Sequence, residues 1–156
     1  MPLVLTREWF ESIKEAWNSD PSNIKSLEGA SERILWTVEE LPLSKLSPEM
    51  EKSILEGGMI DEALFKKAKE TDRVNLLLGW EGGKLVDFRP AREGEAHTAM
   101  MKGKYSVFEK IKTGEDFLWA TMDREIEFRG RMFEFTRRLD GYTKFTLIMV
   151  SKTDLV

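Results

Sequence analysis

Two apolar segments flank a pair of glycines near the middle of the chain. Residues 74–80 form a strongly apolar run, Gly82 and Gly83 follow it, and residues 84–88 continue with further apolar side chains. Such a glycine pair between two β-type segments is typical of a tight hairpin, because glycine adopts positive φ without a steric penalty. The sequence therefore predicts a β-hairpin, which gives the fold at least one antiparallel pair of strands.

Further strands and helices are mixed along the chain without regular alternation. We expect strands at 33–39, 95–101 and 125–131, with Gly103 breaking the second of these three. Residues 142–150 are rich in β-branched and aromatic side chains, which favours a last strand over a helix. Capping residues and apolar periodicity predict helices at 6–18, 20–29, 47–57, 61–70, 106–112, 116–124 and 132–139. This order indicates an α+β fold with a largely antiparallel sheet and helices on one side.

Composition excludes several classes of function. The 156 residues are 41% apolar and carry a net charge of −4, whereas a nucleic-acid-binding protein usually has a basic surplus. No cysteine is present, so disulfides, thiolate zinc sites and cysteine nucleophiles are excluded. The chain shows neither an apolar run of about 18 residues nor the pattern of a signal peptide. We therefore expect a cytoplasmic protein that binds no nucleic acid.

The residues that could support catalysis are better explained by structural roles. His97 is the single histidine and cannot form a zinc site alone. Glu125 and Glu127 share a predicted strand face with Arg129 and Arg131, which indicates a solvent-facing ladder of opposite charges. The segment 79–84 lacks the glycine and hydroxyl positions of a phosphate-binding loop. We therefore expect no enzymatic activity, no metal and no cofactor.

Basic residues gather in the C-terminal third of the chain. Between residues 124 and 144, six basic side chains stand against four acidic ones. This small surplus is typical of a solvated face, and it is also compatible with transient docking to an anionic membrane.

Soft and aromatic side chains are concentrated in the same region. Residues 100–149 hold five of the eight methionines and six of the nine phenylalanines. Met132, Phe133 and Phe135 lie too close together to share one narrow helical stripe, so the helix they occupy has a wide apolar surface. Such a helix either completes a filled core or borders a cavity for an adaptable apolar guest.

The order of elements in the C-terminal half is similar to that of the sterol carrier protein type 2 family. The resemblance is best over residues 74–140, and the chain looks like a divergent, prokaryotic-looking member of that family. It rests on a helix with an apolar pair (Phe108, Ile111), a glycine stop (Gly114), a short helix (Ala120, Met122), a strand (Ile126, Phe128, Gly130) and an amphipathic helix at 132–139.

The resemblance implies a five-stranded, mainly antiparallel sheet covered by helices, in one domain that spans residues 1–156. It also implies an apolar tunnel for a fatty acid, acyl lipid or isoprenoid. The residues expected to line this tunnel are Phe117, Leu118, Met122, Phe128, Met132, Phe133, Phe135 and Leu139. The alternative is a filled apolar core in an interaction module, whose partner is another protein or a second copy of the chain in a homodimer.

Overall fold

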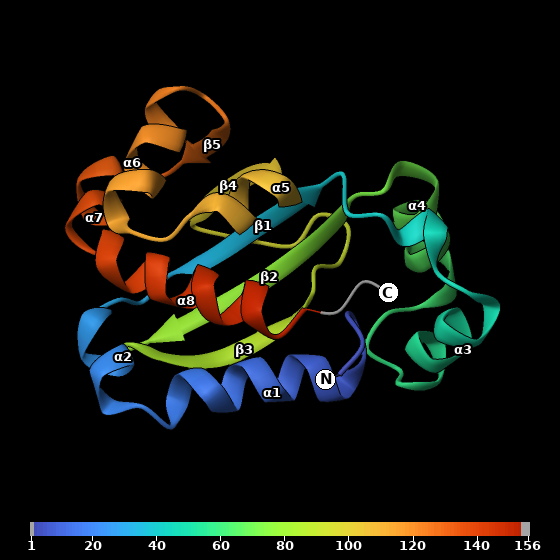
Figure 1. The fold of residues 1–156 in the computed structure, drawn as a ribbon. Helices are drawn as coiled ribbons and strands as arrows, with labels where there is room; N and C mark the ends of the chain where they lie inside the picture. The colour runs from blue at the N-terminus through green and yellow to red at the C-terminus, as the bar shows by residue number, and fades with distance from the viewer. Residues whose placement is uncertain (1, 154–156) are drawn as a thin grey trace.

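The protein, described here from a computed structural model over residues 2–153, is built on a five-stranded sheet with the order β3-β2-β1-β4-β5 (Figure 1). The strands are β1 (Arg33–Glu39), β2 (Val74–Glu81), β3 (Lys84–Pro90), β4 (Ala99–Lys104) and β5 (Ile126–Arg129). Only the β1–β4 pair is parallel, and the other three pairs are antiparallel. The predicted α+β class with a mainly antiparallel sheet is therefore confirmed.

Among the described residues, five of the eight helices begin at a side-chain N-cap. The helices are α1 (Arg7–Asn18), α2 (Pro21–Ser26), α3 (Pro48–Glu56), α4 (Glu62–Thr71), α5 (Tyr105–Lys110), α6 (Gly114–Met122), α7 (Met132–Arg137) and α8 (Leu139–Ser151), with a short 3-10 turn at Leu43–Lys45. Thr6, Asp20, Ser47 and Asp61 each accept a hydrogen bond from a backbone N–H in the first turn of the helix that follows. Thr113 and Asp116 form a reciprocal capping box, which starts α6 two residues before the predicted position.

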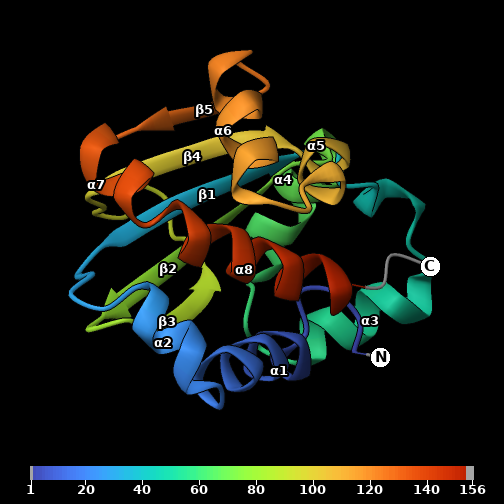
Figure 2. The ribbon, with the colours of Figure 1, turned by 60° about the vertical axis from the view of Figure 1, so that its left-hand side comes forward.

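Helices α1 and α8 lie against one face of the sheet, with α8 running across the strands (Figure 2). Alternate residues of β1, namely Ile34, Trp36 and Val38, point into this layer and are at most 3% exposed. The helices contribute aromatic side chains such as Trp17 and Phe145 to the same core. Burial of these large side chains is the main source of stability for such a layer.

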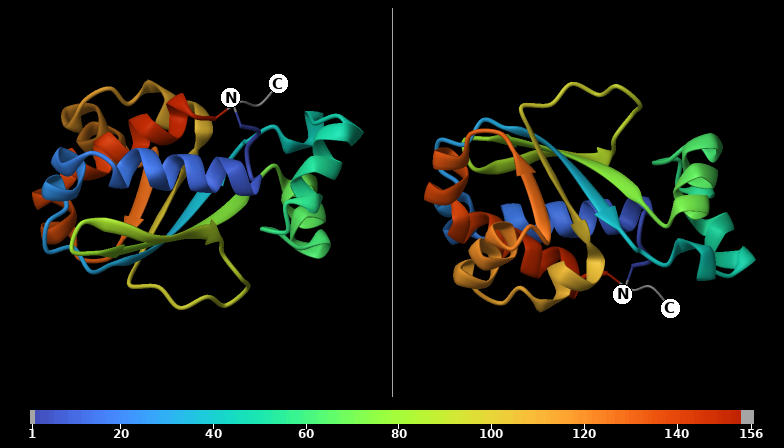
Figure 3. Two further views of the ribbon diagram at one scale, coloured as in Figure 1. Left: turned by 90° about the horizontal axis from the view of Figure 1, so that it is seen from below. Right: turned by 90° about the horizontal axis from the view of Figure 1, so that it is seen from above.

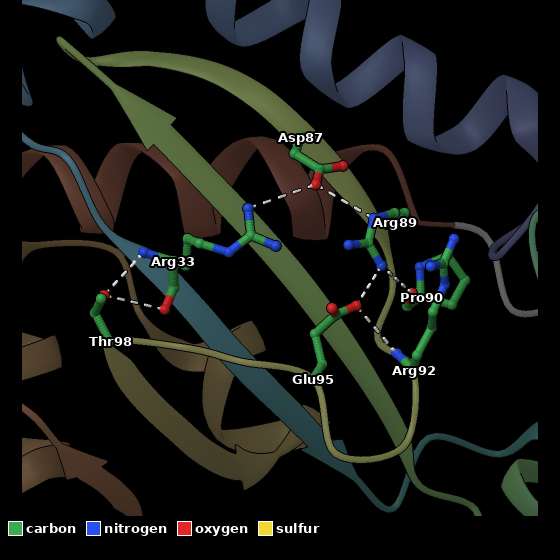
Figure 4. A network of polar contacts seen from close by, with 7 residues as sticks. All are labelled: Arg33, Asp87, Arg89, Pro90, Arg92, Glu95 and Thr98. Atoms are coloured by element: carbon green, nitrogen blue, oxygen red, sulfur yellow. Dashed lines mark hydrogen bonds and ion pairs between the residues drawn. The ribbon is translucent and has the colours of Figure 1, made fainter.

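The opposite face of the sheet is crossed by the segment 91–98, which joins β3 to β4 (Figure 3). A polar network fastens this segment to the strands (Figure 4). Arg89 Nη1 donates to Glu95 Oε1 at 2.5 Å, and Arg89 Nε donates to Asp87 Oδ2 at 3.2 Å. The Thr98 hydroxyl lies 2.9 Å from the backbone N–H of Arg33 and accepts from it. This network holds the crossing segment over the sheet.

The predicted hairpin is confirmed, and Gly83 has a second role in it. Both Gly82 and Gly83 have positive φ, as the tight turn requires. A Cβ on Gly83 would lie 2.1 Å from the carbonyl oxygen of Ile24, so the turn packs directly against α2. Trp17 Nε1 donates to the Gly83 carbonyl at 2.9 Å, which ties the same turn to α1.

The predicted last strand at 142–150 is wrong, because these residues form most of α8. Tyr142, Phe145, Thr146 and Met149 recur at helical spacing and are all buried. The hydroxyl of Thr146 donates to the Tyr142 carbonyl at 2.9 Å, which satisfies a buried polar group inside the helix. Helical periodicity therefore prevails over the β propensity of the individual residues.

The predicted strand at 95–101 lies four residues too early, since β4 spans Ala99–Lys104. Gly103 does not break the strand but pairs with Val38 of β1. A Cβ there would lie 3.2 Å from the Phe108 ring, so the glycine permits a close approach of α5. His97 consequently lies in the crossing segment and is exposed, with Nδ1 2.9 Å from the Glu95 carbonyl oxygen.

Strand β5 is shorter than predicted but has the predicted alternation. Ile126 is buried, whereas Glu127 and Arg129 are exposed and form an ion pair at 2.8 Å. Glu125 and Arg131 are also exposed. The interpretation of this face as a solvated charge ladder is confirmed. Over residues 2–153, no helix has the length and apolar character needed to cross a membrane.

Candidate functional site

An aromatic cluster lies where α6, β5, α7 and α8 meet at one end of the sheet. We define it as Phe117, Phe128, Phe135 and Tyr142. Phe135 is its centre, because it stacks on Phe128 with ring centroids 4.2 Å apart and on Tyr142 at 5.5 Å. Phe117 meets Phe135 edge-on at 5.5 Å. These are favourable aromatic geometries, so the cluster is well packed.

A narrow cavity of about 10 Å³ borders this aromatic cluster. It is lined by Glu32, Ile34, Ala99, Phe128, Arg131, Glu134, Phe135 and Tyr142. This volume has room for about one water molecule, and it is far too small for an acyl chain. The aromatic cluster therefore leaves no open space for an acyl chain at this cavity.

Charged groups surround the outer side of the cavity. Glu134 Oε2 accepts from Arg138 Nη1 at 2.6 Å and from Arg137 Nη2 at 3.0 Å. Burial, helped by the negative charge of Glu32, raises the pKa of Tyr142 to about 12. The Tyr142 phenol therefore stays neutral at physiological pH. Its ring lines the cavity, and its hydroxyl is its one polar group.

The structure divides the eight predicted lining residues into two groups. Phe117 and Phe135 are buried in the aromatic cluster, and Phe128, Leu118 and Leu139 are partly buried. The other three side chains point to solvent, with exposed fractions of 61% for Met122, 45% for Met132 and 76% for Phe133. Together with Trp119, these three make up four of the five large apolar side chains that are markedly exposed among the described residues.

Helix α7 is held to the rest of the molecule by few contacts. It has six residues, lacks a side-chain N-cap and buries only Phe135. Met132 and Phe133 at its start are exposed. A short helix with one buried anchor opens at a low free-energy cost compared with the core strands. The α7 segment is therefore the part of the site best able to move.

A continuous file of aromatic rings leads inward from the aromatic cluster. Tyr142 contacts Trp80 with centroids 6.4 Å apart, and Trp80 contacts Phe145 at 5.3 Å. Phe145 in turn contacts Trp36 at 5.8 Å. Sequence reasoning missed Tyr142 and Phe145 because it placed them on a strand. The i, i+3 and i+7 spacing of Tyr142, Phe145 and Met149 was the signal that could have found them.

Among the described residues, side chains suited to metal binding do not gather in this region. Within residues 2–153, no three His, Asp or Glu side chains come together as a metal site would need. Glu134 at the cavity is engaged in ion pairs with Arg137 and Arg138.

The same architecture occurs in solved structures. The crystal structure of sterol carrier protein 2 superposes with a TM-score of 0.60 at 13% identity, covering 94% of this chain and 96% of that one. The chain has the fold of sterol carrier protein 2. A conserved hypothetical protein from Thermus thermophilus, described as a candidate sterol carrier protein, also gives a TM-score of 0.60 at 13% identity. That match covers 97% of this chain and 90% of the other.

This likeness lies in the fold and not in the sequence. No protein-family model matches the chain, and no curated protein matches it by sequence. The sterol carrier protein 2 fold confirms the resemblance inferred from the order of elements, since the match extends over nearly the whole chain.

Proposed function

We propose that this protein binds an apolar small molecule, such as a fatty acid, acyl lipid or isoprenoid, beneath α7 and α8, and performs no chemistry on it. The observation that carries the proposal is the position of α7. It is a weakly anchored helix with exposed Met132 and Phe133, and it covers an aromatic cluster in a sterol carrier protein 2 fold.

Entry of a ligand requires the Phe135 ring to leave its place between Phe128 and Tyr142. An outward movement of α7 would join the 10 Å³ cavity to the volume of that ring. The cost is the loss of the aromatic contacts, and the compensation is the burial of the ligand. Each CH₂ group removed from water contributes about 0.8 kcal/mol, so a chain of ordinary acyl length offsets the loss.

The exposed apolar residues provide further wall area once the site is open. Met122 and Met132 are unbranched and polarizable, so they adapt to ligands of different shape. Phe133 at 76% exposure gains the most from contact with a guest. We propose that these three side chains turn inward over a bound ligand, as the sequence-based site predicts.

The first experiment is native purification followed by organic extraction and mass spectrometry of the extract. A stoichiometric acyl lipid or isoprenoid is the expected result. Saturable binding of the neutral fluorescent probe 1-aminoanthracene by delipidated protein tests the same site directly. An empty extract together with no saturable binding would contradict the proposal.

A second candidate function is favoured by the exposed apolar residues themselves. Trp119, Met122, Met132 and Phe133 lie within residues 119–133 and would be buried by a second copy of the chain or by another protein. In that case the filled core needs no ligand. Light scattering between low and high micromolar concentration tests this function, and a strict monomer would count against a homodimer.

We further propose transient contact with an anionic membrane through the same segment. Arg124 and Arg131 flank β5, and neither forms an ion pair among the described residues. Each basic side chain near an anionic surface contributes about 1 kcal/mol. Sedimentation with phosphatidylserine vesicles, which should weaken as salt is raised, tests this contact against phosphatidylcholine vesicles.

A further inference from the structure

Two buried indole groups lack a hydrogen-bond partner. The Nε1–H groups of Trp36 and Trp80 meet no acceptor among the described residues, although Trp36 is 0% exposed and Trp80 is 2% exposed. A buried donor without a partner costs free energy, and native proteins rarely leave such groups unsatisfied. Two such donors in one core call for an acceptor that comes from outside the chain.

The indole N–H groups of the other three tryptophans all have access to a hydrogen-bond acceptor. Trp17 donates to the Gly83 carbonyl at 2.9 Å, and Trp9 donates to the Thr153 hydroxyl at 3.3 Å. Trp119 is 55% exposed and can donate to water. The unpaired donors are therefore confined to Trp36 and Trp80.

Both unpaired indoles belong to the aromatic file, one on each side of Phe145. The ring of Phe145 packs against each of them, with centroids 5.8 Å from Trp36 and 5.3 Å from Trp80. Trp80 also contacts Tyr142, which stacks on Phe135. A ligand that enters beside Phe135 and extends along α8 would reach these donors where Phe145 now lies.

No charged side chain among the described residues is buried in the core that holds the two donors. The buried polar residues among those described are Asn23, Thr37, Thr143 and Thr146, all of which are neutral. An ionised carboxylate buried here would have no counter-charge, and its desolvation would be very unfavourable. An uncharged carbonyl oxygen can accept a hydrogen bond from an indole and costs far less to bury.

We infer that the ligand is a neutral lipid with a carbonyl group, such as an ester or a ketone, and that its oxygen accepts from Trp36 or Trp80. This inference rests on the proposed function, because it needs an apolar ligand beneath α7 and α8. The chain of the ligand replaces Phe135 and Phe145 in the aromatic file. The carbonyl oxygen then satisfies a donor that the protein alone leaves unpaired.

The five indole N–H groups of this protein give separate signals in a ¹H–¹⁵N spectrum, so they provide the direct test. Methyl decanoate is titrated into ¹⁵N-labelled protein, with undecane as the matched ligand that lacks oxygen. We expect the Trp36 or Trp80 proton signal to move farther downfield with the ester than with undecane, because only the ester supplies an acceptor. The Trp9 signal is the internal control, because its donor is already bonded to Thr153 and its ring packs against Phe10 and Phe88. Equal shifts with both ligands would overturn the inference.

Affinities from displacement of 1-aminoanthracene provide the second measurement. We expect methyl decanoate to bind about tenfold more tightly than undecane, in line with one net hydrogen bond, and more tightly than decanoate at pH 8. Trp36→Phe or Trp80→Phe, whichever removes the donating indole, should lower ester affinity more than undecane affinity and so reduce the tenfold preference for the ester. Equal or tighter binding of decanoate would overturn the inference while leaving the proposed function intact. No binding of any of the three ligands would instead mean that the proposed function has failed.

Discussion

Phe135 stacks on Tyr142 across the junction of two helices, with ring planes inclined by only 18° and centroids 5.5 Å apart. Arg138 is both the C-cap of α7 and the N-cap of α8. The two rings therefore belong to separate helices that are joined by this single residue. The stack therefore couples the movable α7 to the helix that covers the sheet. Any ligand that displaces Phe135 must also uncover one side of Tyr142.

Replacing Phe135 by alanine should destabilise the protein and improve its capacity for apolar ligands. Truncation of a buried phenylalanine costs about 3–5 kcal/mol, because it leaves a cavity next to Phe128 and Tyr142. Apolar cavities of this kind bind small apolar molecules. We expect a lower free energy of unfolding in urea and tighter binding of 1-aminoanthracene.

Phe10→Ala is the matched control for that variant. Phe10 is 2% exposed and packs against Trp9 and Phe88, away from the aromatic cluster. It should cost a comparable amount of stability without tighter probe binding. If both variants gain affinity equally, the ligand does not enter beside Phe135.

Phe133→Asp and Met132→Asp should reduce ligand affinity with little effect on folding. Both side chains are exposed in the unliganded protein, so their replacement should change the free energy of unfolding by about 0.5 kcal/mol or less. If they turn over the bound ligand, a carboxylate there opposes its burial. We expect several-fold weaker binding of 1-aminoanthracene.

Val86→Asp provides the comparison for these two variants, because Val86 is 45% exposed on β3. This variant removes an exposed apolar side chain from the edge strand opposite β5. Its ligand affinity should match that of the unmodified protein. Unchanged ligand affinity in the Phe133 and Met132 variants would show that α7 is not part of the binding site.

Tyr142 should make the protein less stable at high pH. Its pKa is raised from 10.0 to about 12 in the folded state, chiefly by burial. Above pH 10 the unfolded chain loses this proton while the folded chain keeps it, so the free energy of unfolding falls as pH rises. The contribution of this group is about 2–3 kcal/mol by pH 12, and it is absent below pH 9.

Urea denaturation between pH 8 and pH 11.5 measures this dependence. Other side chains titrate in the same range, so the informative quantity is the difference between the unmodified protein and Tyr142→Phe. The variant should lose less stability as pH rises. Parallel curves for the two proteins would show that the phenol is not buried as described.

The sequence predicted those parts of the fold that depend on local signals. Helix starts at Thr6, Ser47 and Asp61 follow from short-range capping, which needs no knowledge of the tertiary structure. The hairpin at Gly82 and Gly83 is equally local. Strand β4 was misplaced because its boundaries depend on pairing with β1, which is distant in sequence.

The candidate site was predicted only in part for a related reason. The family resemblance pointed to Phe117, Phe128 and Phe135, and in the structure both Phe117 and Phe128 contact Phe135. It could not show that Met122 and Met132 face solvent, because the direction of a side chain on a short helix depends on how that helix docks. The parallel β1–β4 pairing brings β5 and α7 to the edge of the sheet, and that arrangement is set by long-range contacts.

The turn of the hairpin gives a final prediction, in which two neighbouring glycines should respond differently to the same substitution. At Gly82 a Cβ would meet no atom within 4 Å, so Gly82→Ala carries only the cost of positive φ, about 1–2 kcal/mol. At Gly83 the added Cβ would also overlap the Ile24 carbonyl oxygen at 2.1 Å, and backbone atoms of α2 cannot turn aside as a side chain can. Overpacking adds about 1–3 kcal/mol to the cost of positive φ. Gly83→Ala should therefore lower the free energy of unfolding by about 3 kcal/mol or more, as measured by urea denaturation at neutral pH.

The indole signal of Trp17, which donates to the Gly83 carbonyl, should shift in this variant and remain in place in Gly82→Ala. Equal losses of stability in both variants would mean that α2 does not pack on the turn, and the attachment of the hairpin to the helical layer would have to be revised.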